Sequence, residues 1–356
     1  MNLRELRELS GMNQEVLGEL AGVTRQTIAA WERGDREPSM QQVMKLCRVL
    51  NVPIDVMLGI TEQANEPVLL FRADAADMLS HALRQLLTRK AFDYGEIEQL
   101  AGTLPNLPGS RPMATFDQHT VEQVANEVRD WLGVEDAPLG DVLSLLEGKG
   151  LKIFQHKLPN AVSGFSAYTD EIGGAIFVNA GHRTERQYFT ALHELSHLIF
   201  HRKEYQAPTT DIPKIGKSDP RERAADFLAG AVLLPRTIVE AELHPYRNRW
   251  LPFSLLADIK RRYSVSMRTI LVRAGQLGII STRQSFQQIA MIDKKSGKED
   301  EPVDLKPPES LRRLNRLVYQ TLIEEKITTS KAAEVLGEPV YAVKEELGRW
   351  LSVEFA

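Results

Sequence analysis

The chain has 356 residues, of which 43% are apolar and 26% are charged, an ordinary composition for a globular protein of two or three domains. Its single cysteine, Cys47, excludes both a disulfide framework and a cysteine-based zinc cluster. No apolar run reaches membrane-spanning length, so we expect a cytoplasmic protein with no membrane partner. The net charge of −4 excludes a general electrostatic attraction to nucleic acid.

Residues 1–60 carry clear start and stop residues for five short helices. The predicted limits are Leu3 and Ser10 for the first, Asn13 and Gly22 for the second, Thr24 and Gly34 for the third, Ser39 for the start of the fourth, and Pro53 just before the fifth. The second and third helices, joined at Ala21-Gly22-Val23-Thr24, make a helix-turn-helix.

This stretch resembles the Cro/C1 (XRE) family of DNA-binding domains, which implies a lambda-repressor-like fold. The residues that match the family pattern are Gln14, Gly22-Val23-Thr24, Ile28, Trp31-Glu32-Arg33-Gly34 and Pro38-Ser39. The chain departs from it at Gly18, where the family usually has Ala, and we expect a slightly looser helix pair.

In such a domain the third helix enters the major groove. Arg25 and Gln26 are then the predicted base readers, and Thr27 and Gln14 the predicted phosphate contacts. Residues 1–60 contain seven Lys or Arg against eight Asp or Glu, a net charge of −1, so we expect weak or dimer-dependent binding to an operator. The alternative is a helical bundle that binds protein instead of DNA.

A linker is expected at Thr61–Pro67, followed by a helix over Val68–Lys90 with Leu79, Leu83, Leu86 and Leu87 on one side. The proline-rich segment Leu104–Pro112 cannot be a helix interior, and a second globular domain is predicted to start after it. The elements predicted there are helices at Val121–Leu132 and Val142–Leu146 and strands at Leu151–Phe154 and Ala175–Asn179. The last is expected to be an edge strand that holds an extended substrate.

The segment Thr184–Arg202 is a predicted helix, with Thr184 as N-cap and Gln187 closing a capping box. It contains the HExxH pattern His193-Glu194-Leu195-Ser196-His197, in which the two imidazoles lie one above the other on one helical face. Two such imidazoles can share a zinc ion, and Glu194 would be the general base of a hydrolase.

A third ligand decides the class of site. Lys203 stands where a metzincin-like site needs a histidine, and His201 lies one turn too far along the helix, so we expect His201 to be a polar residue near the helix end. Asp219 and Pro220 open a second helix on which Glu222 is the predicted ligand, and Asp226 would accept the far N–H of one ligand histidine. The alternative is that Glu222 closes a capping box with Asp219 and Asp226 is solvated.

From Leu143 to about Pro235 the chain resembles the ImmA/IrrE family of metallopeptidases. The matching blocks are Gly164-Phe165-Ser166, Ala175-Ile176-Phe177-Val178-Asn179, Thr190 to Leu198, Glu222 to Asp226 and Leu233-Leu234-Pro235. The family usually has Asn at the position of Asp226 and often Gly at that of Ser196. The resemblance implies a zinc-dependent endopeptidase, typically cytoplasmic, whose targets are often repressors.

Further elements are predicted beyond Pro235, where the sequence is less informative. They are a helical pair over Trp250–Gly278 that breaks at residues 263–266, a charged loop at Lys294–Asp304, and helices at Leu311–Glu325 and at Ser330–Leu351 around Pro339. The helical pair is the most basic region of the chain, and the last helices have no assigned chemistry. Tyr188 and Tyr205 are the phenols near the motif, and neither is assigned to an oxyanion.

The predicted fold is therefore multidomain and mainly α, with an α+β peptidase domain of zincin type that contains a small sheet. The predicted units are the helix-turn-helix domain at 1–60, a helical linker region at 61–112, the peptidase domain at 113–285 and a helical region at 286–356. The predicted function is that of a zinc endopeptidase and transcription regulator that cleaves a Cro/C1-type repressor in a stress-response, prophage or toxin–antitoxin-like circuit. The alternative is a DNA-binding metal sensor without proteolytic activity.

Overall fold

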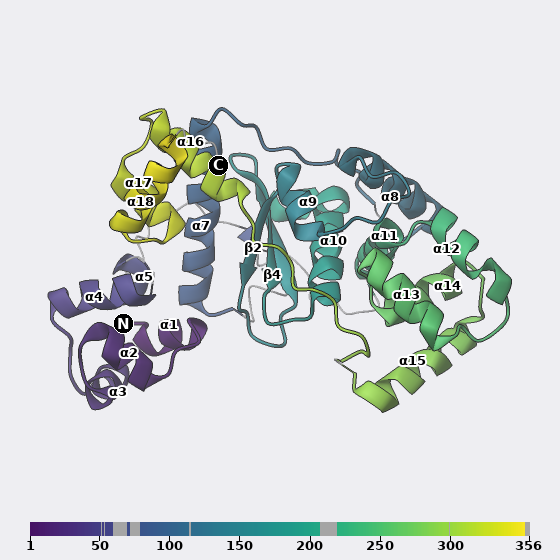
Figure 1. Ribbon diagram of the computed structural model, residues 1–356, viewed down its shortest axis with the longest axis horizontal. Helices are drawn as coiled ribbons and strands as arrows, with labels where there is room; N and C mark the ends of the chain where they lie inside the picture. Colours follow the sequence, from purple (N-terminus) through teal and green to yellow (C-terminus); the bar gives the residue numbers. More distant parts are fainter. Residues whose placement is uncertain are drawn as a thin grey trace.

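The computed structural model describes residues 1–50, 52, 54–59, 70–71, 79–113, 115–206, 219–298 and 300–352. The predicted linker at 61–67 lies outside the described residues. The architecture is mainly helical with one four-stranded sheet, with the N-terminal helices at one end of the molecule (Figure 1). This confirms the predicted fold class. Within the described ranges no helix is both long and apolar enough to cross a membrane.

The N-terminal domain contains α1 (Leu3–Leu9), α2 (Gln14–Ala21), α3 (Arg25–Arg33), α4 (Met40–Leu50) and α5 (Ile54–Leu58). The predicted caps are confirmed: the Asn13 side chain accepts from the Val16 amide and that of Thr24 from the Thr27 amide. Gly22 and Gly34 end their helices in the left-handed conformation that glycine adopts without strain.

The departure at Gly18 has a different consequence from the one expected. A Cβ at this position would lie 2.8 Å from the carbonyl oxygen of Val23, in the turn between α2 and α3. Glycine therefore lets the helix and the turn approach closely, and the expectation of a looser helix pair is wrong.

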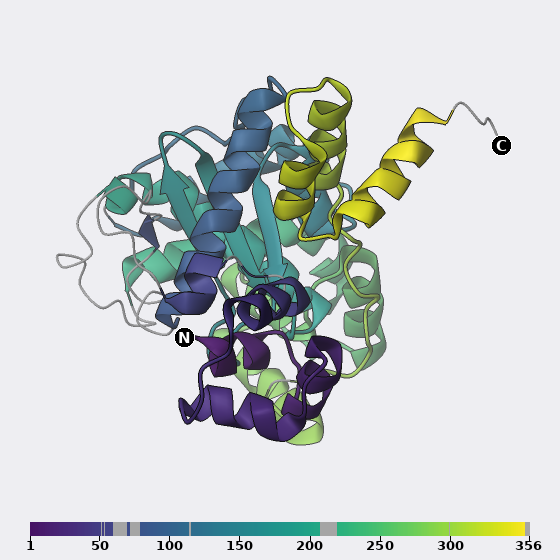
Figure 2. The same cartoon turned by 90° about the vertical axis from the view of Figure 1, so that its left-hand side faces the viewer.

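Helix α7 (His81–Leu100) joins the N-terminal domain to the sheet. The prediction of one helix over Val68–Lys90 is wrong at its start, because residues 70–71 form strand β1 (Leu70–Phe71) and the side chain of Ser80 caps α7. On the apolar side of the helix, Leu86 packs with the core of the N-terminal domain, whereas Leu83 and Leu87 pack on the sheet. Figure 1 shows α7 between the N-terminal helices and the sheet, and Figure 2 shows it from the side, in front of the sheet.

The sheet has the order β1-β3-β4-β2, with β2 (Lys152–His156), β3 (Gly164–Thr169) and β4 (Gly173–Asn179). Strand β4 pairs antiparallel with β3 and parallel with β2, and every residue of β4 is buried. The expectation that this strand lies at an edge is therefore wrong. The sequence does not predict strand β3, because apolar and polar residues do not alternate cleanly along Gly164–Thr169.

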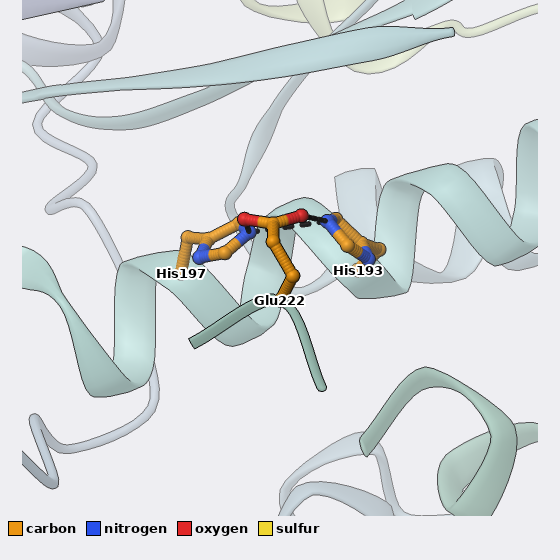
Figure 3. Close-up of side chains that lie close together, drawn as sticks. All are labelled: His193, His197 and Glu222. Carbon is orange, nitrogen blue, oxygen red and sulfur yellow. Dashed lines mark hydrogen bonds and ion pairs between the residues drawn. The ribbon is translucent and has the colours of Figure 1, made fainter. Parts of the chain in front are cut away.

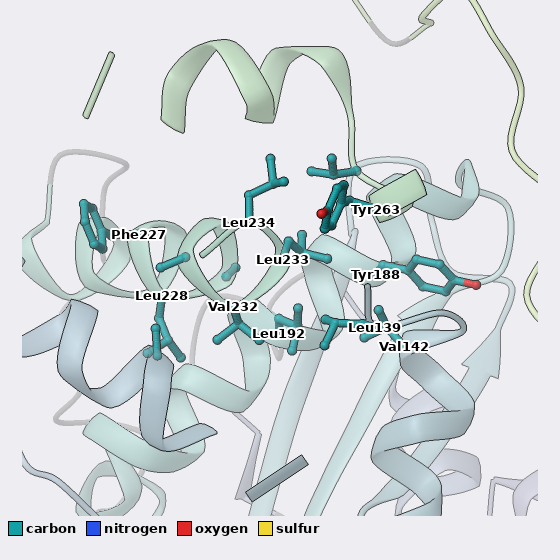
Figure 4. Close-up of a cluster of buried hydrophobic side chains, with 14 of the residues drawn as sticks. Leu139, Val142, Tyr188, Leu192, Phe227, Leu228, Val232, Leu233, Leu234 and Tyr263 are labelled. Carbon is teal, nitrogen blue, oxygen red and sulfur yellow. The ribbon is translucent and has the colours of Figure 1, made fainter. Parts of the chain in front are cut away.

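The other face of the sheet carries α9 (Val142–Gly148) and α10 (Thr184–Phe200), and α10 packs on α11 (Pro220–Leu233), which in turn packs on α8 (Gln118–Leu132). Figure 4 shows this core, in which Leu192 of α10 lies near Leu228 and Val232 of α11. Helix α10 is buried almost all round, so its side chains are held by packing.

The predicted start of α10 needs a correction. Arg183 is the N-cap without a side-chain bond, and Thr184 is the first helical residue, whose hydroxyl donates to the carbonyl of Lys306. The Gln187 side chain donates to the His182 carbonyl, so no capping box forms. Tertiary contacts replace the local cap.

The chain continues through α12 (Arg236–Leu243), α13 (Phe253–Tyr263), α14 (Met267–Gln276), α15 (Thr282–Ser296), α16 (Arg313–Ile323), α17 (Thr329–Leu336) and α18 (Val340–Leu351), with short 3₁₀ turns at Arg202–Gln206 (η1) and His244–Tyr246 (η3). The break at residues 263–266 is confirmed, and Ser266 caps α14. Helix α15 extends to Ser296, so the predicted loop begins later than Lys294. In the basic region Lys260, Arg262 and Arg268 are held in ion pairs with carboxylates of the same chain.

Candidate functional site

The two histidines of the HExxH motif face a carboxylate from the neighbouring helix. On α10, the Nε2 atoms of His193 and His197 lie 3.1 Å apart. From α11, Glu222 brings Oε2 to 3.3 Å from Nε2 of His193 and Oε1 to 3.5 Å from Nε2 of His197. One ligand atom from each of the three residues lies within 4.8 Å of the others, so the group could hold a metal ion (Figure 3).

Helix α11 begins where it brings Glu222 to this site. The carboxylate of Asp219 accepts from the Arg221 amide, and Pro220 fits the first turn because it needs no amide partner there. The carboxylate of Glu222 points to the two histidines, not back to the start of its helix (Figure 3). Of the two readings of Glu222, the geometry favours the ligand over the capping box.

The far nitrogens of both histidines have partners. Nδ1 of His193 lies 2.9 Å from Oδ1 of Asp226, the contact expected from the sequence. Nδ1 of His197 lies 2.9 Å from Nδ1 of His201, which is buried at the end of α10. The distance along the helix excludes His201 as a direct ligand, so the sequence predicts no role for it, but His201 contacts a proposed ligand through this bond.

Charge is concentrated at His193. Burial by itself would lower the pKa of this imidazole, but the hydrogen bonds that the ring donates to the carboxylates of Asp226 and Glu222 raise the pKa to about 10. Without a metal the imidazole is therefore cationic at neutral pH, in contact with two carboxylates. A divalent cation can replace the proton on Nε2 of His193 and bind the Glu222 carboxylate that faces this nitrogen.

The residues fit zinc. Two imidazole nitrogens and one carboxylate oxygen are a ligand set that zinc accepts, and three protein ligands leave a position for water or substrate. Both Nδ1 atoms have partners, which holds the two Nε2 atoms toward Glu222. The site therefore has the donor set and the orientation that a metal ion requires.

Glu194 lies next to the first histidine and is held by a residue that the sequence reading missed. The hydroxyl of Ser166, on β3, donates to Oε2 of Glu194 at 2.5 Å, and the same hydroxyl lies 2.7 Å from that of Tyr205. All three side chains are buried. Ser166 belongs to the block Gly164-Phe165-Ser166, and nothing in its own spacing predicts this contact.

The two phenols near the motif differ in position. Tyr205 is in η1 and reaches Ser166, whereas the hydroxyl of Tyr188 donates to Asp141 at 2.9 Å, among the helices on the other side of α10. Of the two, only Tyr205 is connected to Glu194.

A second candidate site is the exposed start of α3. Arg25 and Gln26 are both exposed there, as base readers must be. The hydroxyl of Thr27 lies 2.9 Å from that of its cap Thr24, and the Gln14 amide donates to Glu32 at 2.8 Å. Gln14 therefore binds within the domain in this structure, and its role as a phosphate contact stays a prediction.

Comparison with known families gives one match over each of the two regions. The family described as "Helix-turn-helix" matches residues 3–57, and the family described as "IrrE N-terminal-like domain" matches residues 146–274. The second match contains the motif helix, Ser166 and Glu222, and the first contains α3.

Individual relatives match the N-terminal domain. "Uncharacterized HTH-type transcriptional regulator YgzD" of Bacillus subtilis (strain 168) is 41% identical over 61 residues, which are 17% of this chain and 92% of the relative. "Uncharacterized HTH-type transcriptional regulator YqaE" of the same organism is 29% identical over 100 residues, 28% of this chain and 83% of the relative. A solved structure, "Mycobacterium tuberculosis transcriptional regulator", is 17% identical with a TM-score of 0.31, and half of each chain (51%) is covered.

Proposed function

We propose that this chain, which belongs to the Cro/C1-type helix-turn-helix family through residues 3–57 and to the IrrE-like peptidase family through residues 146–274, is a zinc-dependent endopeptidase and transcription regulator. The observation that supports the peptidase most directly is the convergence of His193, His197 and Glu222 beside a buried Glu194. A structural metal site gains nothing from a carboxylate base next to an incomplete ligand set.

The proposed roles follow from the contacts. His193, His197 and Glu222 hold zinc, which when bound supplies a Lewis acid and makes water a better nucleophile at neutral pH. Glu194 takes the proton of the attacking water and gives it to the leaving amine. Ser166 fixes the carboxylate of Glu194, and Asp226 fixes the ring of His193.

The helix-turn-helix domain binds DNA, and we propose that it does so through Arg25 and Gln26 and as a homodimer. Two copies double the contacts to an operator, which offsets the missing positive charge of this domain. The exposed start of α3 supports this role.

The proposed substrate is a separate repressor of the Cro/C1 type, cut in an exposed segment. The motivation is the fusion of a regulator domain with a peptidase-like domain in one chain. Self-cleavage at residues 104–112 is less favoured, because this segment is held on α10 and η1: the Arg111 amide donates to the Ile199 carbonyl of α10, and the Arg202 side chain of η1 donates to the Pro108 carbonyl. These hydrogen bonds would have to break before the segment could enter an active site as an extended substrate.

The test combines metal content with cleavage. Purified protein should contain about one zinc per chain; His197→Ala and Glu222→Ala should lose most of it, and Glu194→Gln should keep it. The wild type and Glu194→Gln are then incubated with zinc and candidate repressors, and fragments are mapped by mass spectrometry. Cleavage by the wild type alone supports the peptidase.

Each other outcome has a consequence. Full zinc occupancy in Glu222→Ala would contradict the ligand set. Fragments that form equally with Glu194→Gln would come from a contaminating protease. Bound zinc and DNA without cleavage under inducing conditions would favour the metal-dependent sensor.

A further inference from the structure

A cavity lies where the N-terminal domain meets the sheet and the C-terminal helices. It has a volume of about 530 Å³, and residues of α4, α5, α7, β2, α16 and α17 line it. Figure 1 shows α4 and α5 facing α17 across this region, with α7 beside them. A cavity of this size between parts of a protein is typical of sites that bind small molecules.

Apolar side chains from several elements form much of the wall. Leu86 comes from α7, Phe154 from β2, Leu314 from α16 and Val335 from α17. The ring of Phe154 is stacked on that of Phe177 in β4, with the centroids 4.8 Å apart, so this part of the wall is held in place. Such a wall favours a ligand with an apolar or aromatic body.

Two carboxylates also line the cavity, and both are already paired with cations. The guanidinium of Arg89 donates to Glu334 at 2.5 Å and lies 4.0 Å from the carboxylate of Asp93. The ammonium of Lys331 lies 3.2 Å from the same carboxylate of Asp93. These ion pairs leave neither carboxylate free to balance a further cation.

Lys90 of α7 lines the cavity without such a partner. Among the residues that the structure describes, no carboxylate pairs with its ammonium and no acceptor bonds to it. The nearby His156 is neutral at pH 7, and its Nε2 is buried with no hydrogen-bond partner in the described part of the chain. Burial lowers the pKa of Lys90, because no carboxylate favours the charged form. A half-buried ammonium without a partner suits an anionic group.

We infer that this cavity binds a small molecule with an apolar body and one anionic group, such as a carboxylate or a sulfonate, which pairs with Lys90. Arg48 is exposed, also lines the cavity and forms no ion pair with another described residue, so it adds to the attraction. Asp93 and Glu334 would repel a ligand with several negative charges, which limits the ligand to one.

A ligand in this cavity contacts the N-terminal domain and the C-terminal helices at the same time. It therefore binds best when these parts are arranged as in this structure, and it favours that arrangement. The inference depends neither on the peptidase chemistry nor on the proposed homodimer.

The test compares two fluorescent molecules with the same rings, anilinonaphthalene sulfonate and the neutral N-phenylnaphthylamine. The full-length wild type should bind the sulfonate more tightly than the neutral amine. Lys90→Met should raise the Kd for the sulfonate by roughly 10–100-fold, because a charge-assisted hydrogen bond is lost, and should leave the Kd for the amine nearly unchanged. Lys294→Met removes an exposed lysine from α15, far from the cavity, and should bind both molecules as the wild type does.

Cys47 shows where the sulfonate binds. It is the single cysteine of the chain and lines the cavity, so bound sulfonate should slow its reaction with a thiol reagent. Val335→Trp places an indole in the cavity and should weaken the binding of both molecules. Circular dichroism shows whether each variant stays folded, and Lys90→Gln replaces Lys90→Met if the latter unfolds.

Three results would overturn the site. The first is a wild type that binds the neutral amine as tightly as the sulfonate, or binds neither. The second is equal affinity for the sulfonate in the wild type and in the folded Lys90 variant. The third is a bound sulfonate that leaves the reaction of Cys47 unchanged, since it would then occupy another surface.

Discussion

Ser166 and Glu194 are 28 residues apart in the sequence, yet the hydroxyl of Ser166 donates to the Glu194 carboxylate at 2.5 Å. Strand β3 thus orients the proposed general base on α10. The second contact of the hydroxyl, with Tyr205 at 2.7 Å, leaves Ser166 little rotational freedom. The base is positioned from the sheet as well as from its own helix.

Removing the Ser166 hydroxyl should slow peptide cleavage without loss of zinc. In Ser166→Ala the carboxylate of Glu194 can rotate, and we expect kcat to fall by roughly 10–100-fold, the range found when a residue that orients a catalytic group is removed. KM and zinc content should be nearly unchanged. Ser163→Ala removes a hydroxyl just before β3 that bonds to Arg186, and it serves as the control. An unchanged kcat in Ser166→Ala would show that packing alone orients Glu194.

The local parts of the site were predictable from the sequence. His193 and His197 lie four residues apart on one helix, so their common face follows from helical geometry. Glu222 and Asp226 could be assigned because Asp219 and Pro220 mark the start of their helix. In both cases the prediction depends only on residues a few positions apart in the sequence.

The rest of the site depends on which strands and helices pack against one another, and the spacing of residues along the chain does not predict this. Strand β4 is central because β2 and β3 pair with it on either side. Its apolar run at residues 175–178 is typical of a buried strand but does not say which strands pair with it. Ser166 reaches Glu194 only through that pairing. The turn at Gly337, between α17 and α18, has nearly the same backbone angles as the turn at Gly22, and the sequence does not predict this likeness because Val340 and Tyr341 do not resemble DNA-reading residues.

The contact between Asp226 and His193 predicts the effect of two substitutions. Asp226→Ala removes the acceptor of the His193 N–H, and zinc affinity should fall by roughly 10–100-fold. Asp226→Asn keeps an oxygen acceptor at the same place and should retain most of the affinity. Zinc competition with a chromophoric chelator measures both. Equal affinity in Asp226→Ala and the wild type would show that Asp226 is merely a solvated carboxylate.

The exposed position of Arg25 at the start of α3 predicts a sequence-specific contact. Arg25→Ala should weaken binding to a specific operator by roughly 1–3 kcal/mol and relax the preference at one base pair. Arg36→Ala removes the same charge from an exposed position outside α3, and it should have a much smaller effect. Fluorescence anisotropy with a set of operator variants makes the comparison. Equal losses for the two variants would indicate that Arg25 contributes only charge.

His156, at the end of β2, predicts a pH dependence of stability. Burial, with a smaller contribution from the Lys90 cation, lowers the pKa of His156 to about 4. Between pH 6.5 and 4 the unfolded chain holds a proton on this imidazole that the folded chain does not, so stability should fall as the pH falls through this window, by up to roughly 3 kcal/mol.

The measurement for His156 is urea unfolding of the wild type and of His156→Gln at pH 7.5, 6 and 5. The difference in unfolding free energy between the two proteins should shift in favour of His156→Gln as the pH falls, because glutamine does not titrate. Other groups titrate in both proteins and cancel in this difference. A difference that stays constant with pH would mean that His156 is solvated.

Cleavage of a separate repressor and self-cleavage differ in their response to dilution. Self-cleavage is intramolecular, so its rate per molecule does not change with concentration, whereas cleavage of a separate protein slows as both components are diluted. We expect slowing, because hydrogen bonds to Ile199 of α10 and from Arg202 of η1 hold the segment at 104–112 in place. The rate of fragment formation should fall in proportion to enzyme concentration, with Glu194→Gln as the inactive control. Fragments that end within 61–67 or 104–112 of this chain, formed at a rate independent of dilution, would establish self-cleavage instead.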